Sequence, residues 1–138
     1  MSMQAIREYF RTHRETTKKY LYRNPSYVFF KKGDKEGASG SLGIPVRAGR
    51  TIAADGNIFP KGSITYIATQ RPVSRNKKGI VVEEKFSGFL IDRDSGGAIK
   101  GPGRVDIFWG IDEKAEFRAG YMKSYGEIYY LRKKENIQ

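Results

Sequence analysis

The sequence predicts a mainly β protein with flanking helices, built as a small barrel or sandwich. Short β-prone runs follow one another from residue 44 onward: "TIAAD", "SITYIAT", "GIVVEEKFSGFLIDRD" and "RVDIFWG". Segments with glycine and proline separate these runs, which is the spacing typical of small all-β folds. A length of 138 residues fits one domain with a single core.

The N-terminal part, residues 1–43, predicts a helix, a strand and a connecting loop. Apolar side chains recur at helical spacing within residues 2–22, among many Lys and Arg: Met3, Ile6, Tyr9 and Phe10. Any fraying of this helix is expected near Thr16–Thr17. Asn24–Pro25 predicts a turn, and Tyr27–Phe30 a strand after it. The stretch "KKGDKEGASGSLGIP" predicts an exposed, mobile connection.

Residues 44–133 form the predicted β domain, which also contains a late helix. Asp112 is a candidate N-cap, acidic residues follow in the first turn, and Gly126 is a candidate stop. The run "EIYYLRK" predicts a closing strand, and residues 134–138 predict a loose C-terminal tail.

The charge balance predicts attraction to polyanions. Lys and Arg number 26 against 15 Asp and Glu, for a net charge of +11. Nucleic acid, anionic lipid and anionic cell-wall polymer all qualify as partners. The basic residues come in scattered pairs and triples, which is also the pattern of a solvated surface. A basic barrel that binds single-stranded nucleic acid stays open, although no recognised nucleic-acid motif accompanies the charge.

Several kinds of chemistry are disfavoured. The chain has no cysteine and a single histidine, His13, so we expect no disulfide, lipidated cysteine, metal site or other cofactor. Phosphate-binding glycine motifs and a Ser–His pair are absent as well. The N-terminus lacks the apolar core of a signal peptide, and no run of about 18 apolar residues predicts a membrane span.

Carboxylates are therefore the best catalytic candidates. Asp55 ends the run "TIAAD", Asp94 ends "FLIDRD" before two glycines, and Asp106 lies within "RVDIFWG". Asp before Gly is also an ordinary turn former, whose carboxylate caps its own backbone. Asp106 has apolar neighbours, so an inward-facing carboxylate there needs a hydrogen-bonding or charged partner. Structural and functional roles are both open at this point.

The segment "DSGGAIKG…RVDIFWG" resembles the signature of the three-aspartate (3D) domain family, in the version carried by lytic murein transglycosylases. Five further pieces lie in the family's order: "NPSYVFF", "GIPVRAGRTIAAD", "IFPKGS", "AEFRAGYMKSYG" and "IYYLRK". The resemblance runs from Met3 to Lys133 and implies a double-psi β-barrel over residues 44–133. Family members carry a longer N-terminal portion, with part of the barrel, a second domain, an export signal and often a lipidated cysteine. This chain thus resembles their C-terminal part.

The resemblance also implies an activity. Enzymes of this kind cleave the β-1,4 bond between N-acetylmuramic acid and N-acetylglucosamine in peptidoglycan, and the muramic 6-hydroxyl, instead of water, closes a 1,6-anhydro ring. One acid can then serve twice, first as proton donor to the glycosidic oxygen and then as base for the 6-hydroxyl. Ordinary glycosidases need two carboxylates.

Carried over by motif, the single acid is Asp94. Burial against Phe89, Ile91 or Ile99 would keep it protonated, and Lys100 is expected to point elsewhere. The supporting aspartates are Asp55 and Asp106. The predicted substrate-binding residues are Ser95, Gly96, Gly97, Tyr27 and Trp109. Ser95 stands where Thr or an aliphatic residue is expected. The aromatic side chains Tyr27 and Trp109, with Phe29 and Phe59 as further candidates, offer flat faces to a sugar ring, although ordinary burial tendencies favour a core position for each.

The expected partner is the peptidoglycan glycan strand, whose stem-peptide carboxylates suit a basic surface, and nucleic acid is not favoured. The resemblance implies a periplasmic location, associated with the outer membrane. A missing N-terminal part or a second copy of the chain would complete the cleft. Two alternatives remain: a non-catalytic peptidoglycan-binding module, and a basic nucleic-acid-binding β-barrel.

Overall fold

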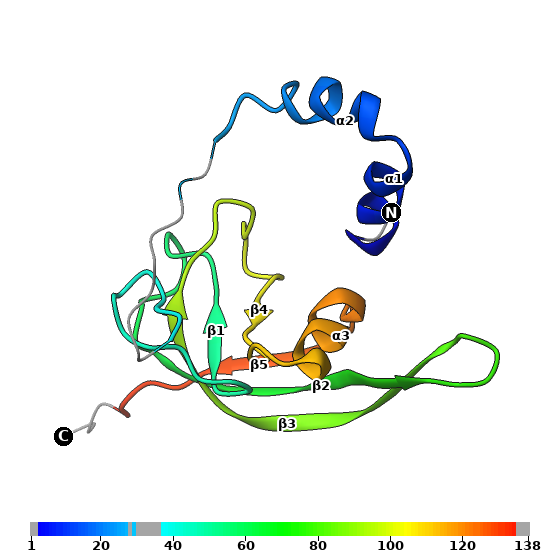
Figure 1. The fold of residues 1–138 in the computed structure, drawn as a ribbon. Helices are drawn as coiled ribbons and strands as arrows, with labels where there is room; N and C mark the ends of the chain where they lie inside the picture. Colours follow the sequence, from blue (N-terminus) through cyan, green and yellow to red (C-terminus); the bar gives the residue numbers. More distant parts are fainter. Residues whose placement is uncertain (1–2, 28, 30–36, 135–138) are drawn as a thin grey trace. The chain divides into compact units, whose positions relative to one another are not determined.

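The computed structural model describes residues 3–27, 29 and 37–134 (Figure 1). The chain divides into two compact units, Met1–Asp34 and Lys35–Gln138. In the part of the chain that is described, the first unit contains two helices, and the second contains a five-stranded sheet with one helix.

In the first unit, the helix predicted over residues 2–22 is two helices, α1 (Met3–Thr12) and α2 (Arg14–Leu21). The break is at His13, where φ is −125° and ψ is 57°, and not near Thr16–Thr17. The Thr12 hydroxyl donates to backbone carbonyls one turn earlier, and the His13 ring stacks on Tyr9 with centroids 4.3 Å apart. Side chains that compete for helical carbonyls in this way favour a helix end.

The strand predicted over Tyr27–Phe30 lies partly outside the described residues, as does the first part, residues 31–36, of the loop predicted after it. Tyr27 and Phe29 are described: neither belongs to a strand, both are exposed, and their rings meet edge to face at 4.9 Å. In the second unit the backbone turns back on itself through an isolated bridge between Ser39 and Pro45.

The sheet of the second unit confirms the mainly β prediction. Its strands are β1 (Thr51–Ala53), β2 (Ile64–Arg75), β3 (Val81–Asp94), β4 (Asp106–Ile107) and β5 (Gly126–Tyr130). They lie in the order β4-β1-β3-β2-β5, with β1 parallel to β3 and every other pair antiparallel. Within the described residues, β4 and β5 are the two edges of the sheet.

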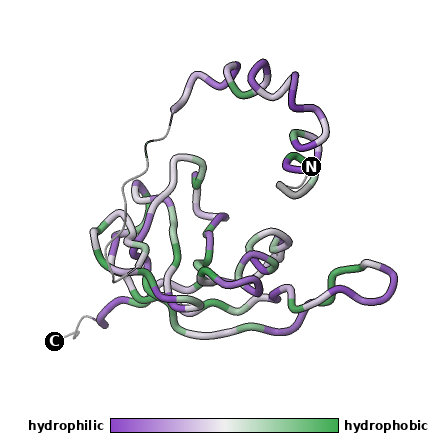
Figure 2. The backbone as a smooth tube through the Cα atoms, in the orientation of Figure 1, coloured by the Kyte–Doolittle hydropathy of each residue, from purple (hydrophilic) through white to green (hydrophobic). Residues whose placement is uncertain are grey.

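The core lies where the three central strands meet. Ile52, Ile67 and Leu90 come from β1, β2 and β3, and each is at most 3% exposed. Each such side chain stabilises the fold by about 1.5–3 kcal/mol relative to an exposed one. Hydrophobic and hydrophilic residues are mixed along β2 and β3, and the hairpin that joins them has a hydrophilic tip (Figure 2). The sheet is thus covered near its centre and more exposed along the hairpin.

Helix α3 (Glu113–Tyr121) lies between β4 and β5 in the chain and packs on β2. Asp112 is its N-cap, as predicted, because its Oδ1 accepts a hydrogen bond from the Ala115 N–H at 2.7 Å. The prediction that Gly126 stops the helix is wrong, since the helix ends at Tyr121 and Gly126 begins β5. A Cβ at Gly126 would collide with Ala68 and Thr69 of β2, so the glycine permits close strand pairing.

Candidate active site

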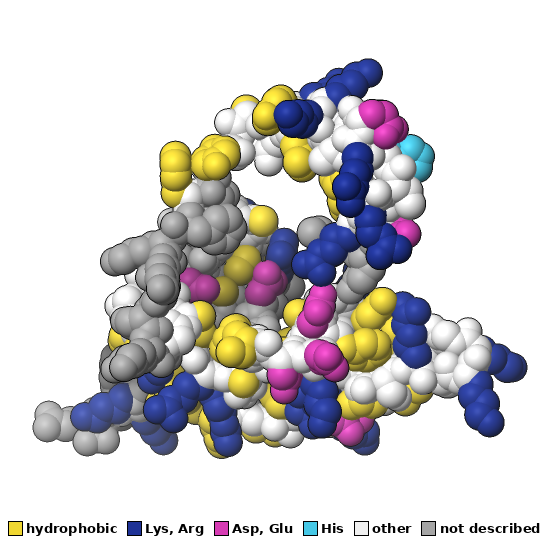
Figure 3. All heavy atoms as spheres, in the orientation of Figure 1, with side chains coloured by type: hydrophobic (Ala, Val, Ile, Leu, Met, Phe, Trp, Pro, Cys, Tyr) yellow, Lys and Arg dark blue, Asp and Glu magenta, His cyan; other side chains and the backbone are white. Residues whose placement is uncertain are grey.

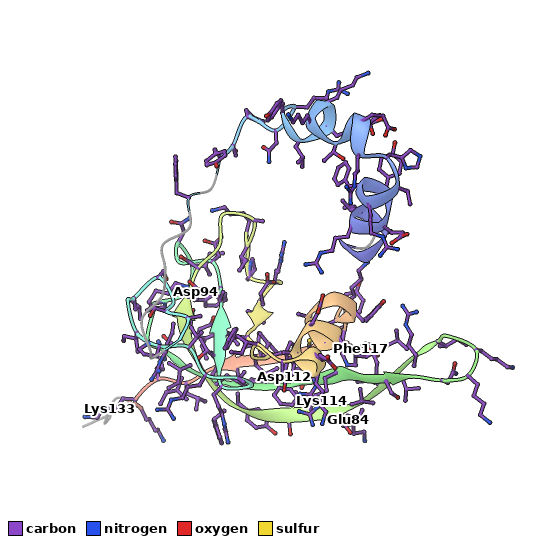
Figure 4. All side chains as sticks on the ribbon, viewed as in Figure 1. Glu84, Asp94, Asp112, Lys114, Phe117 and Lys133 are labelled. Atoms are coloured by element: carbon purple, nitrogen blue, oxygen red, sulfur yellow. The ribbon has the colours of Figure 1, made fainter. Side chains whose placement is uncertain are left out.

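The three aspartates of the signature come together at one end of the sheet. Ala53 of β1 pairs with Asp94 of β3 on one side and with Asp106 of β4 on the other. Asp55 follows two residues after Ala53. Asp94 lies at the end of β3, well apart from Asp112 at the start of α3 (Figure 4). Three segments far apart in sequence therefore bring these aspartates to the same end of the sheet.

Asp94 is half-buried and held by backbone donors. Its Oδ1 accepts hydrogen bonds from the N–H groups of Ser41, at 2.9 Å, and Ser95, at 2.8 Å. Within the described residues, no hydrogen bond to its Oδ2 is present. Phe89, Ile91 and Ile99 are the side chains expected to bury this carboxyl; of these, Phe89 is 55% exposed and packs its ring against Tyr66. Asp94 therefore lies in a hydrogen-bonded turn and not in an apolar pocket closed by Phe89.

Asp55 is buried, and each of its carboxylate oxygens accepts a hydrogen bond. Its Oδ1 accepts from the Asn57 N–H at 3.0 Å, and its Oδ2 accepts from the Gly101 N–H at 2.9 Å. The pKa of Asp55 lies below its ordinary value. The hydrogen bond from Gly101 lowers it most, and the hydrogen bond from Asn57 and the nearby charge of Lys100 lower it further. Lys100 thus acts on Asp55. The carboxylate ties the end of β1 to the loop that leads to β4.

Asp106 has an exposed side chain on an edge strand, so its apolar neighbours do not bury it. Arg104 provides its partner in a two-pronged pair, with Nε to Oδ1 and Nη2 to Oδ2 both at 3.0 Å. The same guanidinium donates to the Ala98 carbonyl at 3.0 Å. The hydrogen bond to Asp106 raises the pKa of Arg104 above its ordinary value, so the guanidinium stays charged.

A cavity of about 950 Å³ lies beside Asp106. Residues 102–107 form one wall, residues 122–128 form another, and Trp109, Ala119 and β2 side chains complete the lining. Of the three signature aspartates, Asp106 alone is among the described residues that line it. The cavity thus lies between the two edge strands, β4 and β5, with one half-exposed carboxylate at its wall.

The loop after Asp94 contains the glycines predicted to approach a sugar. The Gly96 carbonyl accepts a hydrogen bond from the Ile99 N–H at 2.9 Å, and a Cβ at Gly96 would press on the Ile99 side chain. A Cβ at Gly97 would meet no atom within 4 Å, and Ser95 is exposed. Gly96 is thus packed against its own loop, whereas Gly97 and Ser95 are accessible.

The two predicted aromatic platforms have different surroundings. Trp109 is 6% exposed, with Phe86 at 5.1 Å edge to face, and its Nε1 donates to the Met122 sulfur at 3.3 Å. The Arg118 guanidinium lies over its ring at 5.6 Å. Trp109 therefore borders the cavity mainly as a core residue. Tyr27 is 81% exposed and belongs to the first unit.

One buried charge was missed by sequence reasoning. Asp92 is completely buried on β3, and its Oδ1 lies 2.8 Å from the Lys61 Nζ. The only sequence signal was an acidic residue inside the otherwise apolar run "FLID". A charged side chain on a buried strand requires a partner. Here the partner is the lysine of "IFPKGS", which is thirty-one residues away in the chain.

Among the described residues, no group of three or more His, Cys, Asp or Glu side chains is arranged to hold a metal ion. In that same part of the chain, no helix has the length and apolar character to cross a membrane.

Comparison with known proteins decides the family. Residues 50–132 match the 3D domain, and residues 1–31 match the MltA specific insert domain. The chain belongs to the 3D domain family. The two matches together confirm the resemblance and make the chain homologous to the C-terminal portion of membrane-bound lytic murein transglycosylase A, MltA.

Curated relatives of this 3D-domain chain include membrane-bound lytic murein transglycosylase A of Escherichia coli K12, which is 36% identical over 138 residues. The Vibrio cholerae protein of the same name is 33% identical over 132 residues. The alignments cover 96% and 95% of this chain but 35% of each relative. The chain thus spans about a third of the length of the curated relatives it matches.

Solved structures share the fold of the 3D-domain chain. E. coli MltA with bound chitohexaose has a TM-score of 0.78 at 34% identity, over 96% of this chain and 39% of that one. MltA from Neisseria gonorrhoeae has a TM-score of 0.73 at 32% identity, over 94% of this chain and 31% of that one. These structures support an MltA-like 3D domain fold.

Proposed function

We propose that this chain is the 3D-domain part of a lytic transglycosylase that cleaves the β-1,4 bond between N-acetylmuramic acid and N-acetylglucosamine and leaves a 1,6-anhydro end. The observation that carries the proposal is the half-exposed carboxylate of Asp106 at the wall of a large cavity, at the same end of the sheet as the other two signature aspartates. Relatives named lytic murein transglycosylases, one of them solved with bound chitohexaose, support the substrate class.

A single carboxyl group is sufficient for this reaction. It donates a proton to the glycosidic oxygen as the bond to the anomeric carbon breaks. It then accepts the proton of the muramic 6-hydroxyl, whose oxygen bonds to the same carbon. No second carboxylate is needed to activate water.

Asp106 is the carboxyl group that we assign to this role, in place of the sequence-based choice of Asp94. Asp94 is bound through Oδ1 to two backbone N–H groups and is absent from the described lining of the cavity. A proton donor must reach the substrate, and Asp106 faces the space where a substrate fits. Asp55 and Asp94 then act as supports that hold the glycine loop and the strand ends.

Arg104 must move for the acid step. The proton to be donated and the guanidinium compete for the same two oxygens of Asp106, which Arg104 occupies at 3.0 Å. The Arg104 side chain is 52% exposed, which leaves it room to turn into solvent or toward the glycan. Released in this way, it can pair with an anionic group of the substrate.

The remaining predicted site residues take binding roles in this proposal. Ser95 and Gly97 are accessible next to Asp94, so their backbone can approach sugar hydroxyls, and Gly96 shapes their loop. Trp109 forms part of the cavity wall, and Tyr27 is a platform in the first unit. Lys and Arg side chains are spread over the visible face without forming one patch (Figure 3). Such a surface suits a polymer with many dispersed carboxylates.

The open edges of the sheet determine whether the proposed barrel is closed. A double-psi β-barrel is closed, whereas β4 and β5 are edges within the described residues. The N-terminal portion of a longer protein, or a second copy, would pair with these edges and complete the cleft. The proposed location is the periplasm, in association with the outer membrane, in keeping with relatives named membrane-bound. No cofactor takes part in the proposed reaction.

The test is digestion of purified sacculi by the 138-residue chain and three variants: Asp106→Asn, Asp94→Asn and Glu113→Gln. Glu113 is exposed on α3 and serves as the control. General acid–base catalysis contributes about 10²–10⁴-fold, so Asp106→Asn is expected to lower anhydro-muropeptide release by that factor. Full activity of Asp106→Asn with loss in Asp94→Asn would return the acid role to Asp94.

The same assay separates the alternative functions. Retention on sacculi without product release by the wild-type chain favours a non-catalytic peptidoglycan-binding module. Strongly salt-dependent binding to single-stranded DNA, without retention on sacculi, favours a nucleic-acid-binding barrel.

A further inference from the structure

A buried ion pair lies beneath the ends of β1 and β3. Asp92 is 0% exposed, and its Oδ1 accepts from the Lys61 Nζ at 2.8 Å. The Lys61 side chain is 18% exposed. A buried pair of this kind adds little net stability, because the cost of removing two charges from water offsets their attraction. The role of this ion pair therefore lies in the geometry that it imposes.

Lys61 donates to two further acceptors, both of them backbone carbonyls. Its Nζ lies 3.0 Å from the oxygen of Ala54 and 2.5 Å from the oxygen of Asp94. An ammonium group has three donors, so Lys61 is saturated. Ala54 directly precedes Asp55. One ammonium group therefore holds the backbone at two of the three signature aspartates.

The pairing of β1 with β3 is irregular where Lys61 binds. The register of β1 and β3 shifts between Ile52 and Ala53, and the Ala54 N–H reaches the Asp94 carbonyl only at 3.3 Å. A β-bulge leaves ladder groups without regular partners. Lys61 supplies these carbonyls with a charged donor. The backbone at Gly56 leaves room for the Lys61 side chain, because an added Cβ there would lie 3.3 Å from the Lys61 Cε.

Tyr130 closes the other side of the pair. Its hydroxyl donates to the Asp92 Oδ2 at 3.3 Å, and its ring stacks on Phe59 at 4.0 Å. Burial raises the pKa of Tyr130, and the Asp92 charge adds to the effect, so the hydroxyl remains a donor at neutral pH. Both carboxylate oxygens of Asp92 are thus satisfied within the protein.

We propose that Lys61, oriented by buried Asp92, is a positioning residue that sets the signature aspartates relative to one another. The link continues from Ala54 to Asp55, whose carboxylate holds Gly101, and from Gly101 along the loop to Asp106. The catalytic consequence rests on the function proposed above. The geometric consequence, a loop held through Lys61, does not depend on it.

The geometric arm measures amide hydrogen exchange in the double variant Lys61→Met/Asp92→Asn. Removal of both charges avoids an unpaired buried carboxylate, so this variant is expected to fold. Loss of one charge-assisted hydrogen bond predicts about tenfold faster exchange at Gly101 and Ser95. Lys85→Met, an exposed lysine on β3, is the control and is expected to change neither amide. Unchanged exchange at Gly101 and Ser95 in the folded double variant overturns the proposal.

The catalytic arm uses the absence of cysteine from the sequence. Lys61→Cys, alkylated with bromoethylamine while unfolded and then refolded, regains an ammonium group at nearly the position of the lysine. A positioning role predicts that kcat for anhydro-muropeptide release falls in Lys61→Cys with KM nearly unchanged, and that alkylation restores both kcat and the protection of Gly101. Restored protection without restored kcat would contradict the catalytic part. A wild-type chain with no turnover argues against catalysis by this chain alone, and the exchange result still decides the geometry.

Discussion

The carboxylate of Asp55 accepts a hydrogen bond from the backbone N–H of Gly101, at 2.9 Å, across 46 residues of sequence. This bond joins the end of β1 to the loop between Asp94 and Asp106. Gly101 has a φ of +82°, a conformation that favours glycine, so the loop is shaped to present its N–H there. The spacing of the signature aspartates thus depends on one carboxylate that is itself unsuited to proton transfer.

Asp55 is expected to make the fold sensitive to acid. Its folded pKa is lowered by Gly101, Asn57 and Lys100, whereas in the unfolded chain the pKa is about 3.9. The stability it contributes is therefore present above about pH 4 and is lost as the pH falls through the folded pKa. Urea unfolding between neutral and acid pH is expected to show a shallower decline for Asp55→Asn than for the wild type. The exposed-site variant Glu113→Gln should follow the wild type, and equal slopes in all three would contradict the assignment.

Gly126 is expected to tolerate no side chain. Its added Cβ would collide with Ala68 and lie 2.6 Å from the Thr69 Cβ, so Gly126→Ala must separate β5 from β2. Overpacking of this kind costs about 1–3 kcal/mol, to be measured by denaturant unfolding. Gly88→Ala in β3 is the matched control, since its Cβ would meet no atom within 4 Å. A Gly126→Ala variant as stable as Gly88→Ala would show that the strands do not pair as described.

Tyr130 is expected to make the stability of the fold decrease at alkaline pH. Its folded pKa is raised by burial and by Asp92, and its unfolded pKa is about 10. Its contribution to stability is thus complete below about pH 10 and is lost as the pH rises beyond that value. Phenolate absorbance of the wild type should show one of the nine tyrosines ionising only as the chain unfolds. Loss of that late step in Tyr130→Phe checks the assignment, and its persistence would assign it to another tyrosine.

Trp109 is expected to stabilise the fold more than it contacts sugar. Truncation of a buried Trp costs about 3–5 kcal/mol, so Trp109→Ala should unfold at much lower denaturant than Trp109→Phe. The wild-type chain has one tryptophan, and its emission should be blue-shifted and protected from aqueous quenchers. An emission maximum typical of exposed indole would place Trp109 outside the core and revive its role as a sugar platform.

Local patterns predicted most of the secondary structure of the second unit. Short β-prone runs separated by segments with glycine and proline identified the strands, and Asp112 identified the start of α3. Two elements differ from the prediction. Gly126 permits the approach of β5 to β2, a contact between distant segments that no local pattern predicts. His13 breaks the first helix, where Thr12 donates to carbonyls one turn earlier.

The candidate site was predicted in part. The motif identified Asp55, Asp94 and Asp106, and the structure brings them to one end of the sheet through the common partner Ala53. Motif order cannot tell which carboxylate faces a cavity, because that depends on how β4 returns beside β1. The Lys61–Asp92 pair escaped prediction for the same reason, since its members meet only after the chain between them has folded.

The most direct test of the proposed function is the mass of the muramic acid ends that the chain releases from sacculi in heavy-oxygen water. Attack by the 6-hydroxyl predicts ends that are lighter than hydrolytic ends by one water and carry no heavy oxygen. Asp106→Asn is expected to release almost none of them. Ends that carry heavy oxygen, or wild-type release by Asp106→Asn, would contradict intramolecular cleavage with Asp106 as its acid and base.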